Sequence, residues 1–72
     1  MKEDDRVAVL LDGRPHGVPA NSTLAALVAS LGHAPNQVTT AVNGLFIARD
    51  QRDACLLQPG DAVLLFRPIE GG

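Results

Sequence analysis

An unbroken apolar run, Ala62 to Phe66, lies shortly before the end of this 72-residue chain. A run of this kind is typical of a strand that is buried on both faces near the centre of a sheet. Pro68 lacks the amide donor that a sheet ladder needs, so we expect the strand to end before it. The chain then finishes in two glycines, which carry no side chains. The sequence therefore predicts a central strand that leads directly into a flexible tail, residues 68–72.

The length and composition fit one small domain, residues 1–72, with a frayed N-terminus at residues 1–5. Hydrophobic residues make up 46% of the chain, which is enough to form a core. Six lysines and arginines stand against eight acidic residues, and the net charge of −2 leaves no basic patch for a phosphate backbone. We therefore do not expect nucleic acid to be a partner.

Cysteine usage and hydropathy indicate the compartment. The only cysteine, Cys55, cannot form an internal disulfide, whereas small domains of oxidising compartments usually carry several. No apolar run approaches the length that spans a membrane, and the charged N-terminus does not resemble a signal peptide. We expect a cytoplasmic protein that has no membrane partner.

Residues 7–19 are predicted to form a hairpin. Val7 to Leu11 is a short apolar strand, and Asp12-Gly13 favours a tight two-residue turn. The return strand, His16 to Pro19, is short, and its proline confines it to a sheet edge.

A helix is expected after the hairpin, with Ser22 or Thr23 as its N-cap and Gly32 just beyond its end. The apolar residues of this segment recur with the spacing of one helical face. They are Leu24, Leu27, Val28 and Leu31.

The second half is predicted to form a second hairpin, a polar loop and the final strand. Residues 37–43 alternate as in a half-buried strand, with Val38, Thr40 and Val42 on one side. Asn43-Gly44 is the strongest turn signal of the chain, and residues 45–48 are its partner strand. Residues 49–54 are expected to form a polar loop with a helical turn. We expect Leu56 and Leu57 to return to the core and Pro59-Gly60 to form a type II turn.

This order of elements predicts an α+β fold, with a mixed sheet of about five strands and one main helix on one face. We expect the first and last strands to lie side by side at the centre, because they are the two most apolar.

Side chains offer little chemistry. His16, His33 and Cys55 lack the spacing of a metal site, so no metal is expected. Cys55 is interpreted as a small apolar filler rather than a nucleophile. We therefore predict that the chain has no active site of its own.

The terminal glycines, Gly71 and Gly72, are the remaining feature. A carboxylate must be activated before its carbon can be attacked, which requires delivery into the buried site of another enzyme. Glycine suits such delivery, because a tail without Cβ atoms passes through a narrow channel.

The ordered motifs resemble the β-grasp, ubiquitin-like sulfur carriers of the ThiS/MoaD family, and the likeness covers about residues 7–72. It is carried by Ser22-Thr23-Leu24, Ala41-Val42-Asn43-Gly44, Phe46 to Arg49, Pro59-Gly60-Asp61 and Leu64-Leu65-Phe66 with the terminal Gly71-Gly72. Two departures stand out. Relatives often carry a tryptophan after the Asn-Gly hairpin, and Arg52 is the nearest candidate for that position here. The molybdopterin branch usually has a Pro-Pro tail, whereas this tail has only Pro68.

The resemblance implies a role as a sulfur carrier of thiamine biosynthesis and not as an enzyme. A ThiF-like activating enzyme would use ATP to adenylate the carboxylate of Gly72, and a persulfide donor would convert it to a thiocarboxylate. A ThiG-like thiazole synthase would then take the sulfur for the thiazole ring. The chain itself would bind no cofactor, and Ile69, Glu70 and Gly71 would form the tail that enters the partners. A MoaD-like small subunit of molybdopterin synthase and a ubiquitin-like protein modifier are the alternatives.

A partner surface is expected on the final strand. If Val63 and Leu65 face the helix, then Leu64 and Phe66 lie on the other face together with Ala41. The opposite parity, with Leu64 and Phe66 in the core, is the alternative. The resemblance favours the first arrangement, in which these residues and Ile69 guide the tail into the activating enzyme.

Overall fold

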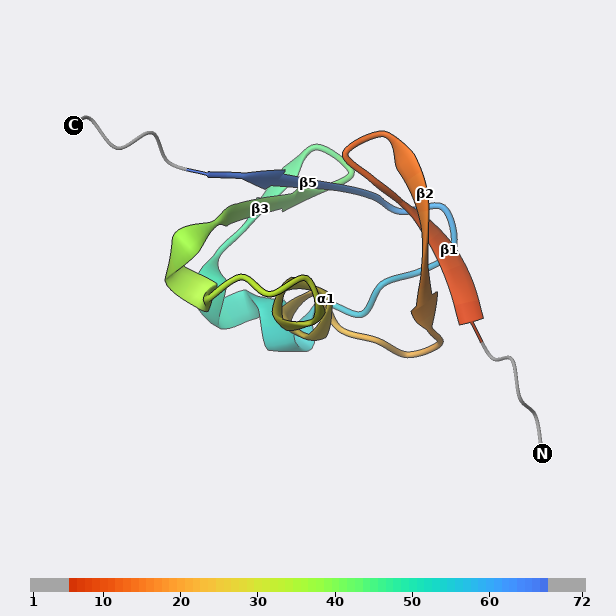
Figure 1. Cartoon of the computed structure of the whole chain (residues 1–72), viewed down its shortest axis with the longest axis horizontal. Coiled ribbons are helices and arrows are strands. Elements are labelled where there is room, and N and C mark those ends of the chain that lie inside the picture. The colour runs from red at the N-terminus through yellow and green to blue at the C-terminus, as the bar shows by residue number, and fades with distance from the viewer. Residues whose placement is uncertain (1–5, 68–72) are drawn as a thin grey trace.

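The computed structural model describes residues 6–67, which form a five-stranded mixed sheet and one α-helix (Figure 1). The predicted α+β class is thereby confirmed. The elements in chain order are β1 (Arg6–Leu11), β2 (Arg14–Pro19), α1 (Leu24–Ser30), the 3-10 helix η1 (Pro35–Gln37), β3 (Thr39–Val42), β4 (Leu45–Ile47), the 3-10 helix η2 (Arg49–Ala54) and β5 (Ala62–Phe66).

Strand β5 lies at the centre of the sheet, whose strand order is β2-β1-β5-β3-β4. It runs parallel to β1, where Leu10 is paired with Ala62, and antiparallel to β3, where Thr39 is paired with Phe66. The prediction that the first and last strands are neighbours is confirmed. Pro19 closes the edge strand β2, as its missing amide donor requires.

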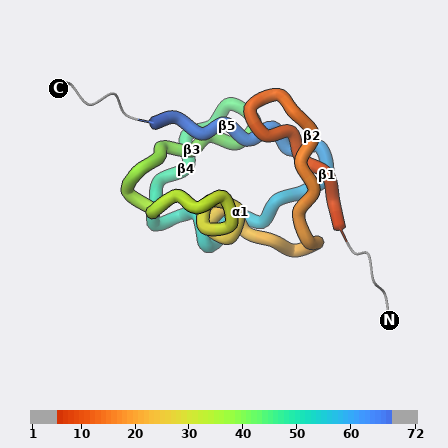
Figure 2. The backbone as a smooth tube through the Cα atoms, in the orientation of Figure 1, coloured from red at the N-terminus to blue at the C-terminus, as the bar shows by residue number. Residues whose placement is uncertain are grey.

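The core lies between one face of the sheet and α1 (Figure 2). Each strand contributes alternate residues to it, because successive side chains of a strand point to opposite faces. The buried members of the cluster are Val9, Val18, Leu24, Leu27, Val42, Leu57 and Val63.

The other face of β5 is not covered, so the prediction of a strand buried on both faces is wrong. Val63 is fully buried, whereas Leu64 and Phe66 are 38% and 51% exposed. Within residues 6–67 one α-helix is present, and it covers only one face. The parity that places Val63 in the core is therefore correct. Leu65 packs against this core as well.

Leu57 enters the core, but Leu56 does not, so half of that prediction is wrong. Leu56 is 50% exposed and forms an isolated antiparallel bridge with Thr23. The amide of Leu57 donates to the carbonyl of Ser22 at 2.9 Å. The backbone at Leu56 and Leu57 is extended, so their side chains point to opposite sides. Only one of two adjacent leucines in such a segment can face inward.

Thr23, rather than Ser22, caps the helix. Its Oγ1 accepts a hydrogen bond from the amide of Ala26 at 3.0 Å. The hydroxyl of Ser22 donates instead to the carbonyl of Pro19. The helix ends at Ser30, so Leu31 lies just past it and packs half-buried against the core.

The second hairpin forms as predicted but is shorter. Val38, Thr40 and Val42 share the buried side, while residues 35–37 form η1 instead of extending the strand. Asn43 and Gly44 both have positive φ, as the tight turn requires. Residues 49–54 form a continuous 3-10 helix, which is more regular than the predicted loop.

Arg52, predicted to lie in a polar loop, is 3% exposed and joins four elements. Its Nε donates to Thr40 Oγ1 at 3.1 Å, while Nη1 and Nη2 donate to the carbonyls of Pro35 at 2.9 Å and Val38 at 2.7 Å. Thr40 in turn donates to the carbonyl of Ile47. One guanidinium thus links η2 to η1 and β3, and through Thr40 to β4.

A second polar bridge ties the start of β5 to the β3–β4 turn. Asn43 Nδ2 donates to Asp61 Oδ1 at 3.0 Å, and Asn43 Oδ1 accepts from the amide of Ala62 at 2.9 Å. Asp61 Oδ2 also accepts from the amide of Gln58 at 2.8 Å. Asp61 therefore closes its own turn and also holds the neighbouring one.

We expect Arg52→Met to lower the free energy of unfolding by about 2–3 kcal/mol, because it removes the donors of buried carbonyl and hydroxyl oxygens. Urea unfolding followed by circular dichroism measures this change. Arg49→Met is the matched control on the same 3-10 helix, since Arg49 is exposed and should change stability by less than about 0.5 kcal/mol. Equal effects of the two substitutions would contradict the assigned role of Arg52.

We expect Asn43→Asp to lower the free energy of unfolding by about 1–2 kcal/mol, because a carboxylate replaces the amide that donates to Asp61. High salt should restore part of the loss by screening the repulsion. Asn21→Asp makes the same change at another exposed asparagine with positive φ and should be nearly neutral. The same urea experiment tests both, and an unchanged midpoint for Asn43→Asp would refute the bridge.

Candidate functional site

The predicted reactive residue Gly72 and the tail residues Gly71, Glu70 and Ile69 lie outside the described residues. The structure does describe the base of the tail. Strand β5 ends at Phe66, paired with Thr39 at the start of β3. Exposed Arg67 is the last residue described.

The base of the tail is held on both sides along β5. On the β1 side, the amide of Leu10 donates to the carbonyl of Asp61 at 2.8 Å, and the amide of Asp12 donates to that of Val63 at 2.9 Å. On the other side, residues of β3 are paired with β5 from Val63 to Phe66. The amide of Leu65 also donates to Asp12 Oδ1 at 3.3 Å. The tail therefore starts from a fixed strand.

The predicted partner residues Leu64, Phe66 and Ala41 come together on the uncovered face of the sheet. Ala41 is paired with Leu64 on one side and with Phe46 on the other. Paired residues share a face, so Phe46 belongs to the same surface. Phe46 is 68% exposed. We call Ala41, Phe46, Leu64 and Phe66 the open-face patch.

Phe46 was missed by sequence reasoning, although a signal for it was present. The Asn43-Gly44 turn fixes the register of a two-residue hairpin, which pairs Val42 with Leu45 and Ala41 with Phe46. Counting outward from that turn would have placed Phe46 beside Ala41. The open-face patch therefore exposes two phenylalanines and a leucine on one side of the sheet.

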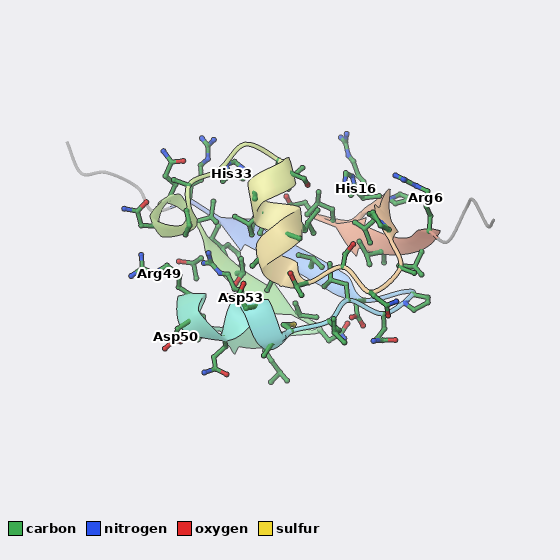
Figure 3. The ribbon with its side chains drawn as sticks, turned by 90° about the horizontal axis from the view of Figure 1, so that it is seen from below. Arg6, His16, His33, Arg49, Asp50 and Asp53 are labelled. Carbon is green, nitrogen blue, oxygen red and sulfur yellow. The ribbon has the colours of Figure 1, made fainter. Side chains whose placement is uncertain are left out.

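Side-chain chemistry is sparse in the part of the chain that the structure describes. Residues 6–67 contain no group of three or more His, Cys, Asp or Glu residues that could hold a metal ion. His33 lies near the end of α1, and His16 lies over β2 (Figure 3). No α-helix of the described region is long and apolar enough to cross a membrane.

Cys55 lies partly buried against the core. Burial, with a smaller contribution from the charge of Asp61, raises the pKa of its thiol. A raised pKa keeps the sulfur protonated at neutral pH, and a protonated thiol is a poor nucleophile. This environment supports the interpretation of Cys55 as a packing residue.

Comparison with known proteins connects this geometry to a family. The sequence model of the ThiS family matches residues 9–72. Two solved structures of a thiamine biosynthesis protein (ThiS) from Geobacter metallireducens are similar to this chain. The crystal structure has a TM-score of 0.79 at 26% identity and covers 92% of this chain and 100% of that one. The solution structure has a TM-score of 0.75 at 28% identity and covers 92% and 88%.

A curated thiazole synthase of Magnetococcus marinus is 36% identical to this chain over 62 residues. The match covers 86% of this chain but only 19% of that protein, so most of the relative has no counterpart here. The family match spans nearly the whole chain, and the solved structures share its β-grasp arrangement of one helix on a mixed sheet. This chain therefore belongs to the ThiS family of ubiquitin-like sulfur carriers.

Proposed function

We propose that the chain carries sulfur for the thiazole ring of thiamine as a thiocarboxylate on Gly72. The observation that supports this most directly is the path of the chain. A central strand, hydrogen-bonded on both sides, leads into a segment that ends in Gly71-Gly72, and the family match extends to Gly72. A fixed strand followed by a short segment whose last two residues lack side chains suits delivery of a carboxylate into another protein's site.

The proposed chemistry belongs to the partners. A ThiF-like enzyme joins the carboxylate of Gly72 to the α-phosphate of ATP, and pyrophosphate leaves. A persulfide sulfur then attacks the acyl carbon and displaces AMP, and a thiol cleaves the resulting S–S bond to leave the thiocarboxylate. The chain is consumed and regenerated as a co-substrate. It needs no bound cofactor and no catalytic side chain of its own.

The thiazole synthase relative supports the choice of acceptor. In that protein a segment similar to this chain is part of a polypeptide called a thiazole synthase. A carrier segment joined to its acceptor enzyme would be present at high effective concentration, which favours transfer between them. We propose a ThiG-like synthase as the separate partner of this chain. The cytoplasmic location remains a prediction.

We further propose that the open-face patch contacts the activating enzyme. Leu64 and Phe66 lie on β5 immediately before the tail, so an enzyme that accepts the tail also meets this face. Burial of exposed aromatic and aliphatic side chains supplies binding energy at such interfaces.

Intact-mass measurement of the protein purified from its own cells tests the thiocarboxylate. We expect a fraction of the molecules to have sulfur in place of one oxygen, and deletion of Gly72 should abolish this species. A MoaD-like subunit would give the same mass, so a thiamine requirement on loss of the gene separates the two roles. Isopeptide conjugates to lysine without any thiocarboxylate would indicate a protein modifier instead.

We expect Phe66→Asp to lower kcat/KM of the activating enzyme for this chain by about tenfold or more, as for an interface residue that contributes strongly. The assay is formation of the adenylate from ATP. Leu56→Asp is the matched control, because Leu56 is equally exposed, at 50% against 51%, but lies in the segment bridged to Thr23 beside α1. Unchanged kinetics for Phe66→Asp would exclude docking through this patch.

A further inference from the structure

A polar hollow of about 300 Å³ opens beside the point where β5 ends. Its lining includes Thr39, which is paired with Phe66, the last residue of β5. Phe46 of the open-face patch also lines it, so the hollow continues that surface around the edge of the sheet. The remaining polar lining comes from Asn36, Arg49 and Arg52.

The hollow is positively charged. Arg49 and Arg52 line it, and no lining residue within the described part of the chain carries a carboxylate. The guanidinium of Arg52 donates only to uncharged oxygens, those of Thr40, Pro35 and Val38. These bonds use three of its five N–H donors. None of the three acceptors is a carboxylate, so none of them neutralises the charge of Arg52. A buried cation of this kind is strongly stabilised by an approaching anion.

A neighbouring hollow of about 270 Å³ beneath α1 provides an internal comparison. It shares Pro35, Arg49 and Arg52 with the first but is also lined by Asp53. That carboxylate offsets part of the positive charge on the helix side. Of these two arginine-lined hollows, the one beside the end of β5 is therefore the one without a carboxylate in its lining.

We propose that this hollow receives a carboxylate side chain of the ThiF-like activating enzyme while the tail occupies that enzyme's site. The inference rests on the proposed function, because it requires an enzyme that closes around the tail. Such an enzyme covers the surface next to the end of β5, and a carboxylate there meets Arg49 and the fixed charge of Arg52. Arginine pairs with carboxylates through two parallel hydrogen bonds, which adds orientation to the attraction.

Arg49 is the residue to substitute, because its side chain is exposed and its replacement should leave the fold intact. It lies toward the end of the molecule where β5 finishes, whereas Arg6 lies toward the opposite end (Figure 3). Arg6 is exposed as well, so Arg6→Glu is a charge-matched control.

Carrier-dependent ATP–pyrophosphate exchange by the ThiF-like enzyme of the source organism measures the effect. We expect Arg49→Glu to raise KM for the carrier about tenfold, Arg49→Gln about threefold and Arg49→Lys less than either, as for a charge pair across an interface. Arg6→Glu should stay within about twofold, since it removes no such pair. Raising the ionic strength from about 0.1 M to about 1 M should raise KM for the wild-type chain by a larger factor than KM for Arg49→Gln, because salt screens the charge pair. Thermal unfolding of each variant confirms that the fold is retained.

Two outcomes would overturn the inference in distinguishable ways. If the wild-type chain supports exchange but Arg49→Glu changes KM no more than Arg6→Glu, the hollow does not receive a partner carboxylate, although the proposed function stands. If the wild-type chain supports no exchange, the proposed function fails and the inference fails with it.

Discussion

The pairing of β5 with both β1 and β3 is the interaction on which the rest of the structure depends. It joins the two hairpins, which are otherwise separate in sequence, into one sheet. It also places Val63 at the centre of the core, where α1 closes over it. Because the same strand leads into the tail, the interactions that hold the domain together also fix the base of the tail.

Two polar bridges support that central strand from either end. At its start, Asn43 and Asp61 join the turn before β5 to the turn between β3 and β4. Near its end, Arg52 holds the segment from Pro35 to Val38, which leads into the first residue of β3. A small domain with a modest core gains from such bridges, since it buries a smaller fraction of its surface than a larger one. The second bridge also leaves an arginine-lined hollow beside the end of β5.

Much of the fold was predictable because its local signals agree with the final arrangement. The helix stripe, the alternation of Val38 and Val42, and the turns at Asp12-Gly13 and Asn43-Gly44 all appear where the pattern placed them. The errors have one common origin. The apolar run of β5, taken alone, indicated burial on both faces, and only the presence of a single helix pointed to an uncovered face. Two adjacent leucines could not show which of them points inward. Burial on a particular face depends on what packs there.

The residues of the candidate site divide in the same way. Some features are properties of the sequence, because they depend only on residue identity and order. They are the terminal diglycine, the apolar strand before it and the lack of a metal-ligand spacing among the histidines and the cysteine. The roles of Phe46 and Arg52 were decided by the tertiary structure. Phe46 joins the open-face patch only because β4 pairs with β3, and Arg52 is buried only because η1, β3 and η2 meet around its guanidinium. A polar residue in a polar stretch carries no local sign of burial, since the acceptors that make its burial possible lie 12 to 17 residues away in the chain.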